Sequence, residues 1–220
     1  MIEKHDPIHH IGLYNISHSI CDDVLDFYNL SPNKNKGVSS SSDINKAKSA
    51  KISTDVTITE YDFANPRIIR YTNVLKKLMQ DYMKMFPSIG RGGWELGITE
   101  TFNIQRYNPG EGFFDWHYER NPFPPANNRV LVFMTYLNDA ADAGTHFMYQ
   151  NVTTECKKGL TVLWPADWTY THKGQISKEF EKTIITGWIS YTGKVNELRR
   201  DNTNLNGNGL VWFVVTPRRI

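Results

Sequence analysis

The chain has 220 residues, of which 25 are basic and 23 acidic, so its formal net charge is only +2. The basic residues are spread along the chain, and this balance gives no reason to expect a nucleic-acid partner. Only two cysteines occur, the start MIEKHDPIHH lacks the apolar core of a signal peptide, and the longest apolar run, 130–137, is too short to span a bilayer. We therefore expect a single domain in a reducing, cytoplasmic setting, without a membrane partner.

The first amphipathic segment lies at 17–28, SHSICDDVLDFY. Its apolar residues Ile20, Val24 and Tyr28 recur every four positions, and a serine before them can cap the first turn. A short helix is predicted here. The next segment, 33–51, is rich in Ser, Asn and Lys and almost devoid of apolar residues. This composition predicts a long, mobile loop.

A strand and then a long helix are predicted next. Val56 and Ile58 alternate with polar residues in TDVTIT, as in a half-buried strand. Asn65 and Pro66 are typical of a helix start, and the helix they begin extends to Pro87. Its apolar residues follow helical spacing and predict a face that packs on the core: Ile68, Tyr71, Leu75, Leu78, Tyr82 and Met85.

From position 98 onward, short apolar segments separated by Pro, Gly or Asn predict a succession of strands. The predicted strands are 98–107, 113–119, 129–137, 145–148, 160–164, 168–173 and 180–190. With the strand near 54–59 they number about eight, enough for two facing sheets. We therefore predict a mainly β fold with flanking helices, a double-stranded β-helix (jelly roll) whose helices pack on the outside of one sheet.

The segment FNIQRYNPGEGFFDWHYE ends in two residues of types that bind metals. Side chains two positions apart in a strand point to the same side, so His117 and Glu119 share a face. A second histidine would complete the 2-His-1-carboxylate arrangement that holds non-haem Fe(II), and His172, in WTYTHKG, is the best candidate. Ten residues further, Lys182 lies in an apolar strand, where a long cation is costly unless it is paired.

The order of these motifs resembles that of a known family. YNPGEGFFDWHYE, RVLVFMTYLN, AGTHF, KKGLTVLWPADWTYTHKG and EKTIITGW follow one another as in the Fe(II)- and 2-oxoglutarate-dependent oxygenases, most closely their prolyl 4-hydroxylase-like branch. The resemblance covers roughly 99–191. It implies an enzyme that uses Fe(II), 2-oxoglutarate and dioxygen, with ascorbate as reductant. The implied reaction hydroxylates an unactivated C–H bond, of a prolyl residue or an amino acid, and releases succinate and carbon dioxide.

The resemblance also implies roles for individual residues. His117, Glu119 and His172 are the implied iron ligands. Lys182 and the hydroxyl of Tyr107 are the implied partners of the distal carboxylate of 2-oxoglutarate. Neighbouring polar or aromatic residues are candidates for substrate binding, and a solvated rim is an equally good interpretation of each: Trp116, Arg120, Arg129 and His146.

Two alternatives to this function stay open. The family's carboxylate is usually aspartate, and here it is Glu119, one methylene longer. A catalytically silent jelly-roll binding module would follow if that side chain is too long for the site. A zinc hydrolase would use the same three ligands, but it would leave Lys182 and Tyr107 without a purpose. Trp188 shares a face with Lys182 by period two and is expected to pack in the core.

We divide the single domain, 1–220, into three parts. Residues 1–97 hold the N-terminal helices, the mobile loop and the first strand, and residues 98–191 form the catalytic jelly-roll core. Residues 192–220 are a C-terminal extension of unknown role, with one further strand predicted in LVWFVVTPRRI. The expected partner is a small-molecule or peptide substrate, and the oligomeric state is left open.

Overall fold

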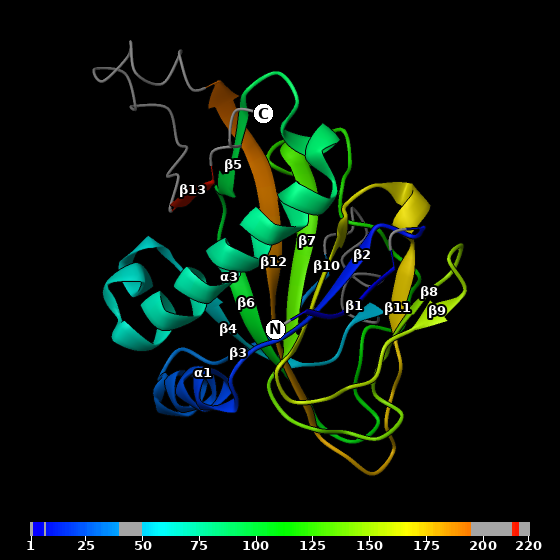
Figure 1. Cartoon of the computed structure of the whole chain (residues 1–220). Helices are drawn as coiled ribbons and strands as arrows, with labels where there is room; N and C mark the ends of the chain where they lie inside the picture. Colours follow the sequence, from blue (N-terminus) through cyan, green and yellow to red (C-terminus); the bar gives the residue numbers. More distant parts are fainter. Residues whose placement is uncertain (1, 7, 40–49, 195–212, 216–220) are drawn as a thin grey trace.

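The computed structural model describes residues 2–6, 8–39, 50–194 and 213–215. In the described part of the chain, two α-helices lie in the first half and strands dominate the second half (Figure 1). The helices are α1 (His18–Leu30) and α3 (Pro66–Met85), with 3₁₀ turns η1 (Glu60–Ala64), η2 (Pro87–Gly90), η3 (Ala126–Asn128) and η4 (Trp168–Tyr170). The strands are β1 (Ile2–Asp6), β2 (Ile11–Asn15), β3 (Asn35–Lys36), β4 (Thr54–Ile58), β5 (Trp94–Ile98), β6 (Phe102–Tyr107), β7 (Arg129–Tyr136), β8 (Thr145–Phe147), β9 (Val152–Thr153), β10 (Leu160–Pro165), β11 (His172–Gly174), β12 (Lys182–Lys194) and β13 (Phe213–Val215).

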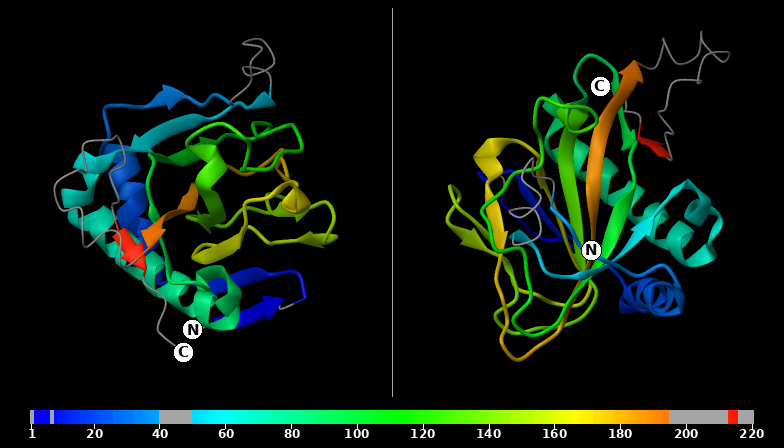
Figure 2. Two further views of the ribbon diagram at one scale, coloured as in Figure 1. Left: turned by 90° about the horizontal axis from the view of Figure 1, so that it is seen from above. Right: turned by 180° about the vertical axis from the view of Figure 1, so that it is seen from behind.

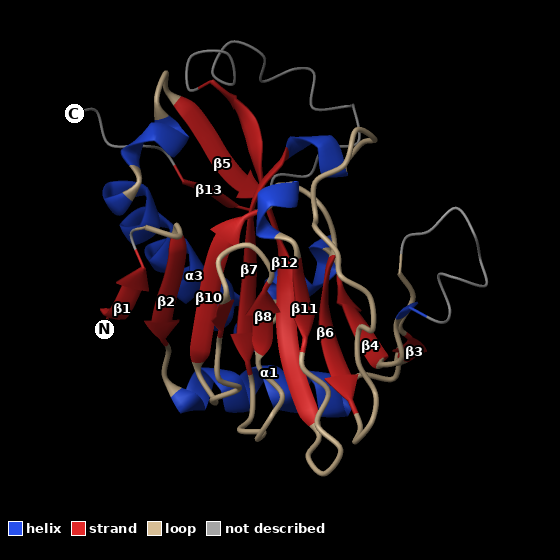
Figure 3. Ribbon diagram, turned by 90° about the vertical axis from the view of Figure 1, so that its right-hand side faces the viewer, coloured by secondary structure: helices blue, strands red, loops and turns tan. Residues whose placement is uncertain are grey.

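These strands form two antiparallel sheets. The larger sheet has the order β1-β2-β10-β7-β12-β6-β4-β3, with β5 paired to the far half of β12 and β13 paired to β5. The smaller sheet has the order β11-β8-β9 and lies in front of the larger one in Figure 3. The predicted jelly roll of two facing sheets is therefore confirmed.

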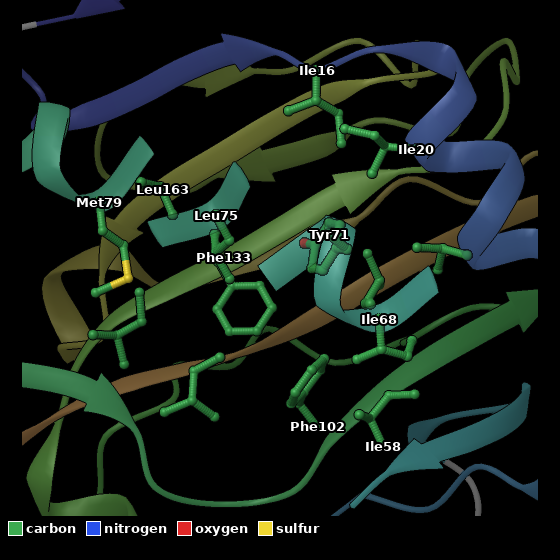
Figure 4. Packing of buried hydrophobic residues seen from close by; sticks show 14 of the residues in the cluster. Ile16, Ile20, Ile58, Ile68, Tyr71, Leu75, Met79, Phe102, Phe133 and Leu163 are labelled. Atoms are coloured by element: carbon green, nitrogen blue, oxygen red, sulfur yellow. The ribbon is translucent and has the colours of Figure 1, made fainter. Parts of the chain in front are cut away.

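Both helices pack on the face of the larger sheet that is turned away from the smaller sheet (Figure 2). The predicted helices are confirmed, because α1 and α3 bury most of the apolar positions that repeat at helical spacing; Leu78 and Met85 of α3 are only partly buried. Figure 4 shows Tyr71 and Leu75 of α3 above Phe133 of β7. A Cβ atom at Gly187 of β12 would lie 2.4 Å from the Cβ atom of Phe102 and 2.6 Å from the ring of Phe133, so only glycine allows this packing. Neither helix in the described part of the chain has the length and apolar character needed to cross a bilayer.

Strand β7 is buried on both faces. Leu131 and Phe133 belong to the core under the helices, whereas Val132, Met134 and Tyr136 belong to a second core between the two sheets. This follows from the period of two along a strand, which sends neighbouring side chains to opposite faces. It explains why the sequence reads there as an uninterrupted apolar run.

Several predicted strands are wrong in their extent. The predicted strand 98–107 starts earlier, at β5, and is interrupted at 99–101 before β6. No continuous strand occupies 113–119, where only isolated bridges join Phe113 to Lys51 and His117 to His172. The predicted strand 168–173 begins as the turn η4, and only its end belongs to β11. The segment 113–119 has apolar and aromatic residues typical of a strand, but its backbone forms bridges only at Phe113 and His117.

The N-terminal region holds more strands than the sequence predicts. Strand β2 pairs with β10, and β1 pairs with β2 at the edge of the larger sheet. Strand β3 lies at the start of the predicted loop 33–51 and pairs with β4, and residues 40–49 of that loop lie outside the described residues. The further strand predicted near the C-terminus is confirmed as β13. The rest of the extension beyond residue 194 lies outside the described residues, and the three-part division of the chain stays a prediction.

Candidate active site

A cavity of about 670 Å³ lies between the two sheets. One wall comes from β6, β7 and β12 of the larger sheet, and the other comes from β8, β11 and the segment 113–121. The described parts of the segment 33–51 add Val38, Ser39, Ala50 and Lys51 to the lining. Lys51 is buried and pairs with Asp55 at 2.6 Å, so its charge is neutralised within the wall.

His117, Glu119 and His172 converge in this cavity. One ligand atom from each residue lies within 4.8 Å of the others. Oε1 of Glu119 is 3.5 Å from Nε2 of His117 and 3.6 Å from Nε2 of His172. The two histidines are brought together by a pair of backbone hydrogen bonds, from His117 N to His172 O at 3.1 Å and from His172 N to His117 O at 2.9 Å. This single bridge positions His117 beside His172, although the predicted strand 113–119 does not form.

Both imidazoles are oriented by their backbones. Nδ1 of His117 lies 3.0 Å from the carbonyl oxygen of Asp115, and Nδ1 of His172 lies 2.9 Å from that of Tyr170. A carbonyl oxygen only accepts, so each Nδ1 carries the proton and each Nε2 keeps a free lone pair. Hydrogen bonds of this kind fix the tautomer and ring orientation of metal-binding histidines.

The protonation states suit a divalent cation. Burial and the neighbouring His117 lower the pKa of His172 to about 4, so this imidazole is neutral near pH 7. Burial raises the pKa of Glu119, but its interactions with His117, His172 and Arg129 outweigh burial and lower this pKa to about 2, so the carboxylate is charged near pH 7. Two neutral imidazole nitrogens and one carboxylate oxygen are the donors of the 2-His-1-carboxylate site for non-haem Fe(II). The residues present therefore fit that metal.

Lys182 and Tyr107 face each other on the paired strands β12 and β6 and line the same cavity. Lys182 is 6% exposed, its Nζ donates to the carbonyl oxygen of Gln175 at 3.0 Å, and it lies 5.2 Å from the centre of the Tyr107 ring. Burial lowers the pKa of Lys182 to about 8. Among the described residues, no carboxylate lies within ion-pair distance of this ammonium group. A Cβ atom at Gly174 would lie 3.1 Å from Nζ, so glycine keeps room beside it.

The Tyr107 hydroxyl donates a hydrogen bond of 2.6 Å to Oε1 of Gln105, which also lines the cavity. Burial, and then the charges of Asp55 and Glu119, raise the pKa of Tyr107 well above its ordinary value. The hydroxyl is therefore a neutral donor at all ordinary pH values. Its role toward 2-oxoglutarate stays a prediction.

Of the four predicted substrate-binding residues, two line the cavity and two lie outside its lining. Trp116 lines the cavity and is 42% exposed, and Arg129 also lines it. Arg120 lies outside the cavity lining, where it donates to Asn127 O at 3.1 Å and pairs with Asp167. His146 also lies outside the lining, with its Nδ1 2.6 Å from the hydroxyl of Thr153 and its ring edge-on to Trp116.

Sequence reasoning missed the contact made by Trp188. This residue was expected to be a core side chain, but its indole N–H donates to Oε2 of Glu119 at 2.8 Å. Because Trp188 and Lys182 are six positions apart, the alternation of side chains along a strand correctly indicated that both lie on the cavity face of β12. It could not show which residue of another segment meets the indole on that face.

Comparison with known proteins agrees with this geometry. Residues 102–190 match the family model of the 2OG-Fe(II) oxygenase superfamily. A search among curated proteins found no match. The matched segment contains His117, Glu119 and His172, the three residues that could hold a metal ion, so this part of the chain is similar to the 2OG-Fe(II) oxygenase superfamily. Members of this superfamily use Fe(II), 2-oxoglutarate and dioxygen, as the sequence predicted.

Its fold is like that of prolyl 4-hydroxylases. The viral collagen prolyl hydroxylase of Paramecium Bursaria Chlorella virus-1, solved as a 2OG complex, is 16% identical with a TM-score of 0.58, over 82% of this chain and 95% of that one. A prolyl-4-hydroxylase of Pseudomonas putida is 14% identical with a TM-score of 0.61, over 84% and 94%. A prolyl hydroxylase of Trichoplax adhaerens, in complex with a hypoxia inducible factor oxygen degradation domain peptide fragment, is 14% identical with a TM-score of 0.63, over 89% and 88%.

Proposed function

We propose that this protein hydroxylates an unactivated C–H bond of a prolyl residue or an amino acid, with Fe(II) bound by His117, Glu119 and His172. The observation that carries this proposal is the joint presence, in one cavity, of these three ligands and a buried lysine that has no ion-pair partner among the described residues. Three protein ligands leave three octahedral positions open for the cosubstrate and dioxygen. When bound, Fe(II) would supply the redox chemistry that couples 2-oxoglutarate decarboxylation to hydroxylation.

Lys182 holds the distal carboxylate of 2-oxoglutarate in this proposal. An ammonium group in an apolar wall is costly without a counter-charge, and a dicarboxylate cosubstrate supplies one. The hydroxyl of Tyr107 adds a neutral donor on the facing strand. The remaining walls keep bulk water away from the reacting atoms, since Met134, Tyr136 and Trp164 are buried side chains that line the cavity.

The substrate class is argued from the rim of the cavity. Trp116 and Tyr118 line it and are 42% and 50% exposed. Exposed aromatic side chains suit the apolar ring of proline in an extended peptide. Solved structures that share this fold include prolyl hydroxylases, and one of these is in complex with a peptide fragment. A proline-containing peptide is therefore the first substrate to test, and free amino acids follow.

Ascorbate is the proposed reductant, because iron oxidised in uncoupled turnover must be returned to Fe(II). A cytoplasmic setting remains our expectation. It is supported by the two cysteines, Cys21 and Cys156, which are both free and buried. Nothing in the net charge of +2 calls for a nucleic-acid partner.

The test is succinate formation by the purified protein with Fe(II), 2-oxoglutarate, ascorbate and a panel of proline-rich peptides and amino acids. We expect one substrate to gain the mass of one oxygen atom with succinate in equal amount. The Lys182→Ala variant should form no succinate at ordinary cosubstrate concentrations, whereas Lys178→Ala, at an exposed lysine, should match the parent. No succinate from the iron-loaded parent would overturn the proposal, and zinc-dependent hydrolysis would then favour a hydrolase.

A further inference from the structure

The two oxygens of the Glu119 carboxylate have different surroundings. Oε1 faces the two imidazoles, at 3.5 Å from His117 and 3.6 Å from His172. Oε2 accepts the indole N–H of Trp188 at 2.8 Å. One oxygen is therefore directed at the metal position, and the other is held by the protein.

Trp188 is itself held in place by Arg129. The guanidinium carbon lies 3.5 Å from the centre of the indole ring, a close cation–π contact. Arg129 also donates to the backbone oxygen of Glu119 at 2.9 Å. Arg129 thus contacts both Trp188 and the backbone of Glu119.

Glu100 fixes the direction of Arg129. Its two carboxylate oxygens accept from Nε and Nη2 of Arg129 at 2.8 and 2.6 Å, and both side chains are largely buried. This fork leaves only Nη1 on the side of Glu119, 3.6 Å from Oε2. Glu100 thus accepts the paired hydrogen bonds of Arg129. The carboxylate of Glu119 is therefore held chiefly by the neutral indole of Trp188, and its negative charge remains available to a cation.

We propose that Trp188, backed by Arg129 and Glu100, is a positioning residue that fixes the side-chain conformation of Glu119 so that a glutamate serves as the carboxylate ligand. The inference rests on the proposed function, since it assigns the metal to the same three ligands. Glutamate has one more rotatable bond than aspartate, and an unanchored side chain would lose that freedom on binding. The indole removes this freedom before the metal arrives. A shorter carboxylate cannot reach both the metal position and the indole.

The experiment measures Mn(II) affinity by electron paramagnetic resonance titration, without 2-oxoglutarate. Loss of a residue that orients a metal ligand typically costs 10–100-fold in affinity, so we expect about a tenfold loss in Trp188→Phe. The control is Trp168→Phe, at an exposed tryptophan that lies outside the cavity lining, and it should bind as the parent does.

A double-mutant cycle tests the coupling to Glu119. Glu119→Asp should weaken Mn(II) binding in the parent, and it should weaken binding on the order of fivefold less in the Trp188→Phe background, where no indole contact remains to be lost. If Trp188→Phe does not fold, 3-benzothienylalanine at position 188 replaces only the N–H by sulfur and should show the same tenfold loss.

The outcomes separate the positioning role from the metal site. Parent affinity in Trp188→Phe, or additive effects in the cycle, would overturn the role of Trp188 while leaving the metal site intact. His172→Ala is measured alongside and should abolish binding. If His172→Ala binds Mn(II) as tightly as the parent, or if the parent binds none, the metal site of the proposed function is wrong and the positioning role falls with it.

Discussion

Replacement of Lys182 by methionine should stabilise the metal-free protein and abolish cosubstrate binding. Burial lowers the pKa of this lysine from 10.5 to about 8, and that difference corresponds to roughly 3 kcal/mol against the charged form in the folded chain. Methionine keeps most of the length and removes the charge. It also leaves the carbonyl oxygen of Gln175 without its 3.0 Å donor, which costs roughly 1 kcal/mol. The net expectation is a gain of roughly 2 kcal/mol in the free energy of unfolding at pH 7.

The measurement is urea unfolding of the parent, Lys182→Met and the control Lys178→Met, across pH 7 to 10.5. Between pH 8 and 10.5 the unfolded chain binds a proton at Lys182 that the folded chain has released, so the stability of the parent rises with pH. The methionine variant lacks this titration. Its advantage over the parent should therefore be largest below pH 8 and shrink as pH approaches 10.5.

For 2-oxoglutarate binding the expectation is the opposite of that for stability: the parent should bind the cosubstrate more tightly than Lys182→Met. Loss of one partner of a buried ion pair costs roughly 3 to 5 kcal/mol, on the order of a hundred- to a few-thousand-fold in Kd. Calorimetric titration under nitrogen with Fe(II) present measures this in the same variants. A methionine variant that is less stable than the parent at pH 7 would refute the argument from burial. An unchanged Kd for 2-oxoglutarate would refute the assignment of Lys182 to the cosubstrate.

Variants at three further positions test the rest of the site. His172→Ala should lose Fe(II) because only two ligands remain, and full iron occupancy by metal analysis would contradict the triad. Glu119→Asp should keep measurable cosubstrate turnover and Glu119→Ala should not, since only the former keeps a carboxylate; equal turnover in the alanine variant and the parent would show that Glu119 is no ligand. Tyr107→Phe should raise the Kd for 2-oxoglutarate roughly tenfold with iron binding unchanged, as expected for one hydrogen bond to a charged group; an unchanged Kd would leave Tyr107 as a partner of Gln105 alone.

The sequence by itself was sufficient for the helices and for the type of fold. The apolar residues of α1 and α3 repeat at helical spacing, and an apolar helix face of this kind packs against the protein core. The apolar run 130–137 likewise predicted a strand, and the structure shows that β7 is buried on both faces. The order of the five motifs was enough to predict the family whose model matches residues 102–190. These features are local or linear in the chain, so no knowledge of distant contacts was needed.

Only the tertiary structure decided how distant segments meet. His117 reaches His172 through a single backbone bridge, although 113–119 forms no continuous strand. Trp188 was correctly placed on the inner face of β12, but its hydrogen bond to Glu119 depends on how the segment 113–121 crosses that strand. The same holds for Arg129, whose partner Glu100 lies 29 positions earlier in the chain. Periodicity specifies which face of an element is buried, whereas the partner on that face is set by the pairing of strands far apart in sequence.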